Sequence, residues 1–164
     1  QIMVDGIRIK EPHTTLGLFG VLTINDTNEH YRLSINKRGK LELKSIDKKE
    51  ADIKPCKIIN KKVIGKDKIQ INMSDGRNIL LKKNDYKTGD SLLISIPKQE
   101  IKEHITLDKG TAIILIGGKH IGVTGVIENI EGETIVFLDE TKQTLQTEKR
   151  YAFGLGIKKS SLTV

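Results

Sequence analysis

Two apolar segments, residues 111–116 and 123–127, are joined by a stretch in which four of nine consecutive residues are glycine. Glycine adopts backbone conformations that a Cβ atom forbids, so this density predicts a tight, bulged turn between two closely paired strands. Lys119 and His120 lie at the tip of the turn and would present a cation and an imidazole to solvent. The glycines expected to shape this hairpin are Gly110, Gly117, Gly118, Gly122 and Gly125.

The remainder of the chain predicts an all-β fold. Short segments in which Ile, Leu or Val alternates with polar residues recur along it, as is typical of half-buried strands. Asp-Gly pairs at residues 5–6 and 75–76 indicate hairpin turns. Trp is absent and aromatic residues make up 4% of the chain, so aliphatic side chains must fill the interior. One helical turn is expected at residues 47–52, with Asp47 as N-cap and Glu50 as its capping-box partner.

The spacing of these strands predicts three units. Residues 1–27 hold a hairpin too small to fold alone, and we expect it to end a module whose earlier part precedes residue 1. Residues 28–107 are interpreted as a central β domain that begins within the polar loop at residues 25–30. Residues 108–164 contain five short strands, which suits a small five-stranded SH3-like barrel better than a sandwich.

The positive charge is concentrated in one part of the chain. The formal net charge is +7, yet residues 110–164 contain 6 basic and 6 acidic residues. Residues 32–68 contain 13 basic and 5 acidic residues. A basic patch favours a polyanionic partner, although an ordinary solvated surface would look the same by charge alone. No basic amphipathic helix or apolar span of about 20 residues indicates a membrane partner.

Catalytic and metal-binding patterns are missing from the sequence. Cys56, the only cysteine, lies among alternating strand residues and is interpreted as an inert thiol in a reducing compartment. The four histidines have no metal-binding spacing: His13, His30, His104 and His120. The Gly-Gly-Lys at residues 117–119 lacks the pattern of a phosphate-binding loop. We therefore predict no enzymatic activity, cofactor, metal or small-molecule substrate.

Many cations and few aromatic side chains favour one mode of nucleic-acid recognition. Lysine and arginine contact phosphates, whereas splayed bases need planar stacking partners. Folded RNA read through its backbone and shape, with strong salt dependence, is the predicted partner. The candidate contacts are Arg8, Lys37, Arg38, Lys40, Lys57, Lys61, Lys62, Arg77, Lys119 and His120.

Several ordered motifs carry a resemblance to a known family. The glycine hairpin resembles a KOW motif, found in ribosomal proteins and in NusG-type transcription factors. The hairpin at residues 4–6, with Gly17, resembles the end of an S-four-type RNA-binding domain. The motifs that follow in order are Tyr31-Arg32-Leu33, Lys37-Arg38-Gly39-Lys40, Glu50-Ala51, Lys54, Cys56-Lys57, Asp75-Gly76-Arg77, Tyr86, Gly89-Asp90-Ser91, Ile101, residues 110–125, Thr147, Tyr151-Ala152-Phe153 and Gly154-Leu155-Gly156. Together they resemble the small-subunit ribosomal protein S-four-e family of archaea and eukaryotes.

The resemblance implies a structural role in translation. It implies a cytoplasmic constituent of the small ribosomal subunit that binds ribosomal RNA beside neighbouring ribosomal proteins and is a monomer outside the ribosome. It also implies that residues 1–27 are the end of the S-four-type domain. Thr15 and Gly20 depart from the family pattern, which usually has a proline and an aspartate there. Two alternatives remain open: a KOW-bearing transcription or translation factor, and an SH3-like protein-interaction module without RNA.

Overall fold

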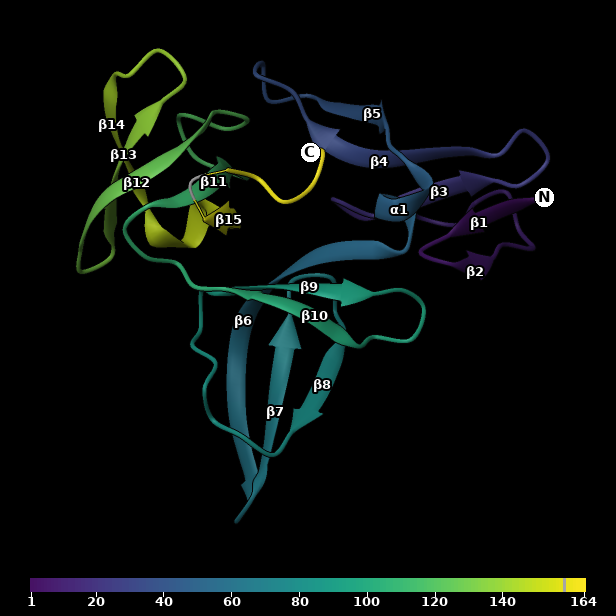
Figure 1. The fold of residues 1–164 in the computed structure, drawn as a ribbon, viewed down its shortest axis with the longest axis horizontal. Helices are drawn as coiled ribbons and strands as arrows, with labels where there is room; N and C mark the ends of the chain where they lie inside the picture. Colours follow the sequence, from purple (N-terminus) through teal and green to yellow (C-terminus); the bar gives the residue numbers. More distant parts are fainter. Residues whose placement is uncertain (158) are drawn as a thin grey trace.

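The computed structural model describes residues 1–157 and 159–164, and within these the fold is all-β, as predicted. Fifteen strands form three antiparallel sheets of five strands each. In Figure 1 the first and third sheets lie at the top of the view, and the second lies below them. Helical structure among the described residues is confined to a four-residue helix and a three-residue 3-10 turn.

The first sheet has the strand order β2-β1-β3-β4-β5. Its strands are β1 (Ile2–Val4), β2 (Ile7–Arg8), β3 (Val21–Ile24), β4 (Glu29–Ile35) and β5 (Leu41–Ser45). β3 and β4 pair along their length, from Val21 opposite Arg32 to Ile24 opposite Glu29. The predicted unit boundary between residues 27 and 28 therefore lies in the turn of one hairpin, and the change of sheet comes at residues 46–52.

The second sheet has the order β10-β9-β6-β7-β8 and follows the short helix α1 (Lys48–Ala51). Its strands are β6 (Ile53–Gly65), β7 (Lys68–Met73), β8 (Asn78–Leu81), β9 (Ser91–Ser95) and β10 (Ile101–Ile105). The first part of β6 pairs with β9 and the remainder with β7. The capping-box prediction is wrong, because Asp47 makes no side-chain cap and the Glu50 carboxylate instead accepts the Thr163 amide at 3.1 Å.

The third sheet contains the predicted glycine hairpin and has the order β14-β13-β12-β11-β15. Its elements are β11 (Thr111–Leu115), β12 (Thr124–Glu131), β13 (Thr134–Asp139), β14 (Thr144–Glu148), the 3-10 turn η1 (Lys149–Tyr151) and β15 (Ala152–Ile157). β11 lies between β12 and β15 and is buried throughout. Alternating side chains of these strands, such as Ile127, Ile135 and Phe137, form one apolar cluster.

Apolar contacts between the sheets hold the three together. Phe19, before β3, packs edge-on against Phe153 of β15, with ring centroids 4.8 Å apart. Val21 shares a second cluster with Ile96, next to β9. The first sheet thus buries its apolar residues against its neighbours, which fixes the positions of its turns relative to the other two sheets.

Candidate nucleic-acid interface

Two turns from different sheets meet at one surface. They are residues 36–40, between β4 and β5, and residues 117–122, between β11 and β12, and we call them the paired loops. Gly122 has φ +82°, and a Cβ built on it would lie 2.0 Å from the carbonyl oxygen of Asn36. Only glycine allows the two backbones to approach so closely. A second glycine, Gly39, leaves room in the same way for the Ile121 side chain.

Polar contacts reinforce this junction. Lys37 forms an ion pair with Glu140, in the turn after β13. The other carboxylate oxygen of Glu140 accepts a hydrogen bond from Thr124 Oγ1 at 2.9 Å. The hydrogen bond from the Lys37 ammonium, followed by that from Thr124 and by the charge of Lys37, lowers the pKa of the Glu140 carboxyl. The turn of the first sheet is therefore tied to two strands of the third.

The paired loops bring together five of the predicted contact residues. Lys37, Arg38, Lys40 and Lys119 are exposed, and His120 is half-buried. Among the described residues, no carboxylate lies within ion-pair distance of Arg38, Lys40 or Lys119. These two groups lie about eighty residues apart in the sequence, and the fold brings the turns that carry them into contact.

The remaining predicted glycines shape the third sheet in two ways. A Cβ at Gly117 would lie 2.5 Å from the Tyr151 ring, and Gly118 lies over the same ring. A Cβ at Gly125 would lie 2.3 Å from the Leu138 carbonyl oxygen. Gly110 has φ +87° with open space around it. Close approach therefore explains glycine at the first three positions, and backbone conformation explains it at the fourth.

Lys57 must be removed from the predicted phosphate contacts. Its side chain is buried between the second and third sheets, with 6% exposure. The ammonium donates to the carbonyl oxygens of Lys149 at 3.0 Å, Arg150 at 3.1 Å and Ala152 at 2.6 Å. Its three donors are occupied, so Lys57 serves to hold η1 and the start of β15 against β6.

Lys57 gives a testable pH dependence. Its pKa is lowered from 10.5 to about 8, mainly by burial and to a smaller extent by repulsion from Lys149. Between pH 8 and 10.5 the unfolded chain then binds a proton that the folded chain has released, so stability rises with pH. We expect wild type to gain about 3 kcal/mol relative to Lys57→Met across this window. Urea unfolding at several pH values measures this, Lys98→Met is the exposed control, and parallel curves would contradict the prediction.

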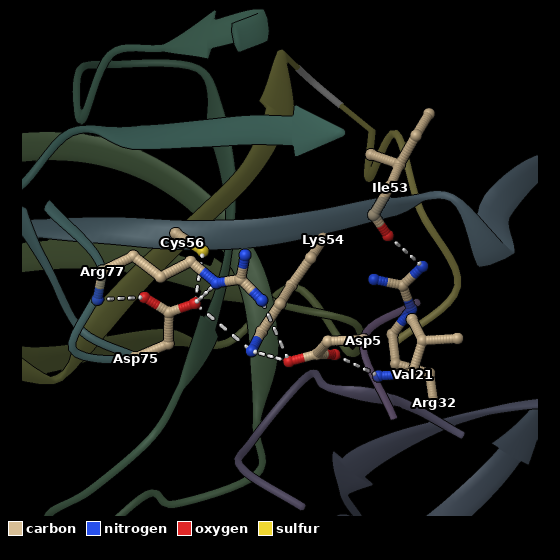
Figure 2. Close-up of polar contacts among 8 residues, drawn as sticks. All are labelled: Asp5, Val21, Arg32, Ile53, Lys54, Cys56, Asp75 and Arg77. Atoms are coloured by element: carbon tan, nitrogen blue, oxygen red, sulfur yellow. Dashed lines mark hydrogen bonds and ion pairs between the residues drawn. The ribbon is translucent and has the colours of Figure 1, made fainter. Parts of the chain in front are cut away.

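Arg77 is also not a free cation. It belongs to a largely buried ionic network that joins the first two sheets, together with Asp5, Lys54 and Asp75 (Figure 2). The Lys54 ammonium lies 2.8 Å from Asp5 Oδ2 and 3.3 Å from Asp75 Oδ2. Arg77 Nε lies 2.8 Å from Asp75 Oδ2 and Nη2 lies 3.4 Å from Asp5 Oδ2. Two cations balance two carboxylates, which suits a structural junction and not an RNA contact.

Cys56 lies beside the network, in surroundings that suit the inert thiol predicted for it. It is fully buried, and its thiol donates to Asp75 Oδ2 at 3.4 Å. Burial, with the neighbouring Asp75 carboxylate, raises the pKa of the thiol. Burial alone would raise the pKa of Asp75, but the hydrogen bond from the Arg77 amide and the charge of Lys54 lower it below 3.8.

The other three predicted contacts lie away from the paired loops. Lys61 is half-buried and donates to Asn84 Oδ1 at 2.6 Å and to the Tyr86 carbonyl oxygen at 2.9 Å. Lys62 and Arg8 are exposed. Sequence reasoning also missed Arg32, which counts toward the basic segment but is fully buried and donates to the Glu50 and Ile53 carbonyl oxygens.

No group of three or more His, Cys, Asp or Glu side chains in residues 1–157 and 159–164 could hold a metal ion. None of the helices described there has the length and apolar character needed to cross a membrane.

Comparison with known proteins identifies a family. The model of the family described as "Ribosomal family S4e" matches residues 27–101. The small ribosomal subunit protein eS4 of Methanocaldococcus jannaschii is 41% identical over 169 residues, covering 95% of this chain and 68% of the relative. The eS4 of Archaeoglobus fulgidus is 34% identical, covering 100% of this chain and 71% of the relative.

A solved structure agrees with these relatives. The crystal structure of the 30S ribosomal protein S4e from Thermoplasma acidophilum superposes with a TM-score of 0.83 at 30% identity. The match covers 98% of this chain and 82% of that chain. The resemblance drawn from the ordered motifs is thereby confirmed, and this chain belongs to the S4e family of ribosomal proteins.

Proposed function

We propose that this chain is a structural constituent of the small ribosomal subunit and that its paired loops bind ribosomal RNA. The relatives are small ribosomal subunit proteins, and a ribosomal protein of this family is a structural component of cytoplasmic ribosomes and not an enzyme. The prediction of no enzymatic activity is therefore confirmed by the family. RNA contact by the paired loops, including a KOW-type role for residues 110–130, is the part that we propose.

The observation that carries this proposal is the contact between loops from two sheets. These loops carry four exposed cations, Lys37, Arg38, Lys40 and Lys119, and the half-buried His120. Lysine and arginine at such a surface suit phosphate oxygens, which fix the position and register of a folded RNA. Stacking of bases has little support here, because the Tyr151 ring lies beneath Gly117 and Gly118 and Arg150 lies 4.7 Å from its centroid.

The proposed RNA contacts come from all three sheets. The first sheet supplies one of the paired loops and the third sheet supplies the other, whereas the second sheet joins them. Arg8, at the edge strand β2, and Lys62, in β6, remain proposed RNA contacts on other surfaces. We also propose neighbouring ribosomal proteins as partners within the subunit, and a monomer outside it.

The test is charge reversal of Lys37, Arg38 and Lys40 to glutamate, with small-subunit RNA binding measured from 50 to 200 mM salt. Each lost phosphate contact should flatten the plot of log affinity against log salt by about one unit. We therefore expect a slope flatter by about three units and weaker binding at low salt. Lys10, Lys98 and Lys109, exposed and outside the paired loops, give a control with the same change in charge.

Thermal unfolding of both triple variants checks that they fold. Equal affinity and an equal salt slope for the two triple variants would mean that the paired loops contribute only general positive charge. Co-sedimentation of the wild-type protein with polymerase instead of small subunits would favour a KOW-bearing transcription factor. No observation on the described residues favours a protein-interaction module without RNA.

A further inference from the structure

The far end of the second sheet extends beyond its own core. β6 runs for 13 residues, more than twice the usual length of a strand, and its second half continues past the buried part of the sheet. Residues 61–68 and 80–83 make up this end, and we call them the arm. In Figure 1 the arm points away from the first and third sheets, at the bottom of the view.

The arm exposes large aliphatic side chains. Val63 and Leu80 are each 65% exposed, and Ile64 is 51% exposed. By contrast, Ile69 and Ile71 of the neighbouring strand are buried in the core of the sheet. Val63 and Ile64 therefore lie near the end of the β6–β7 hairpin and form an apolar tip, whereas Leu80, opposite Gln70, is exposed on the outer face of the sheet.

Unpaired lysines surround this tip. The arm contains six lysines and one acidic residue, Asp67. The Lys61 ammonium donates hydrogen bonds to the loop at residues 84–86. Within the described part of the chain, no acidic group lies within ion-pair distance of the other five: Lys62, Lys66, Lys68, Lys82 and Lys83. The arm thus carries more free positive charge than the paired loops do.

Strand register places cation and apolar side chain together. Lys62 lies opposite Gln70, which lies opposite Leu80, so the three side chains cross one face of the arm in a row. Lys68, two residues before Gln70 on the same strand, points to that face as well. Leu80 is therefore the aliphatic side chain on the lysine face, whereas Val63, opposite Ile69, lies on the other face.

We propose that the arm is a second RNA-binding element, which places its apolar tip in the wide, shallow minor groove of an RNA helix while its lysines contact the flanking phosphates. The proposal rests on the proposed ribosomal function and adds a site remote from the paired loops. Lysine is depleted at the cores of protein interfaces, and the arm offers none of the aromatic anchors common there. A lysine-rimmed aliphatic tip suits an A-form groove better than a protein surface.

The buried thiol makes a direct test possible. Cys56 is the only cysteine and is fully buried, so a cysteine introduced at the surface can be labelled selectively. Asp67→Cys places an Fe-EDTA probe at the arm, and Gln143→Cys places one in the turn next to the paired loops. Each labelled protein is bound to small-subunit ribosomal RNA, and hydroxyl-radical cleavage is mapped along the RNA.

We expect cleavage from both probes, at two separate RNA segments, with the arm's segment in a helix. Cleavage from Gln143→Cys alone would overturn the arm proposal and leave the proposed function intact. Absence of RNA binding by every variant, and by wild type, would overturn the proposed function itself. A third outcome would also overturn the proposal. In that outcome the arm probe cuts no RNA in assembled subunits, while proteins with substitutions in the arm fail to enter the small subunit. The arm would then contact a neighbouring protein and not RNA.

Paired substitutions separate the two parts of the proposal. Lys62→Glu with Lys68→Glu should flatten the salt slope by about two units, whereas Lys98→Glu with Lys109→Glu should not. Val63→Ser with Ile64→Ser keeps the charge, and we expect about tenfold weaker binding at an unchanged slope. Unchanged affinity of the serine variant would exclude the apolar tip from the contact, and an unchanged slope of the glutamate variant would exclude the lysines.

Discussion

Replacing Lys54 with methionine is expected to lower the free energy of unfolding by about 3–5 kcal/mol, the usual cost of leaving a buried charge without its partner. Lys54 is 3% exposed and lies between the carboxylates of Asp5 and Asp75. Without its ammonium, two largely buried carboxylates share only Arg77. The first and second sheets would then be held together across a site of uncompensated negative charge.

Urea unfolding of the Lys54→Met variant at pH 7 measures this loss. Lys102→Met, which removes an exposed lysine 3.2 Å from Glu100, is the control and should cost less than about 1 kcal/mol. The difference between wild type and Lys54→Met should shrink as the pH falls below 4. The pKa of Asp75 is lowered in the fold, so its favourable contribution is present above 3.8 and is lost on protonation. A loss equal to that of the control would show that the network contributes nothing.

Gly122→Ala is expected to destabilise the protein by at least about 2 kcal/mol and to weaken RNA binding by the paired loops. The new Cβ would meet the Asn36 carbonyl oxygen at 2.0 Å, and a φ of +82° is strained for alanine. The loop must therefore move away from the turn at residues 36–40. Gly110→Ala is the matched control, because Gly110 has a similar φ of +87° with nothing within 4 Å.

Unfolding and RNA-binding measurements on the two alanine variants distinguish the effect of backbone strain from the effect of moving the paired loops apart. Both variants should lose stability through the backbone, but Gly122→Ala should lose more and should also bind RNA less tightly than Gly110→Ala. Equal RNA affinity in the two variants would argue against the joint surface as the binding site.

The strands could be predicted because they depend on local patterns. Alternation of apolar and polar residues and Asp-Gly turns identified most of the strands, including the hairpins around residues 75–76 and 117–122. The capping box failed because Glu50 has a better partner, Thr163, more than a hundred residues away. Distant partners of this kind leave no trace in a local pattern.

The functional surface was predicted in its parts and not in its assembly. The cationic turn at residues 37–40 and the glycine loop were both identified, but their contact depends on Gly39 and Gly122, which lie far apart in the sequence. The buried cations Lys54 and Lys57 were missed because a charged residue in an alternating segment is assumed to face solvent. The start of β6 is buried at consecutive positions, 54 to 58, a pattern typical of a strand covered on both faces.

The contact between the paired loops also orders events during synthesis. The turn at residues 36–40 is translated before the third sheet, whereas β15, which completes that sheet, is translated after nearly all the other described residues. The glycine loop follows β11, and β11 pairs with β15 along its whole length. The joint surface therefore exists only after translation has passed Ile157. An RNA that needs both loops would select chains in which the third sheet has formed, so the binding surface itself reports that synthesis of the three sheets is complete.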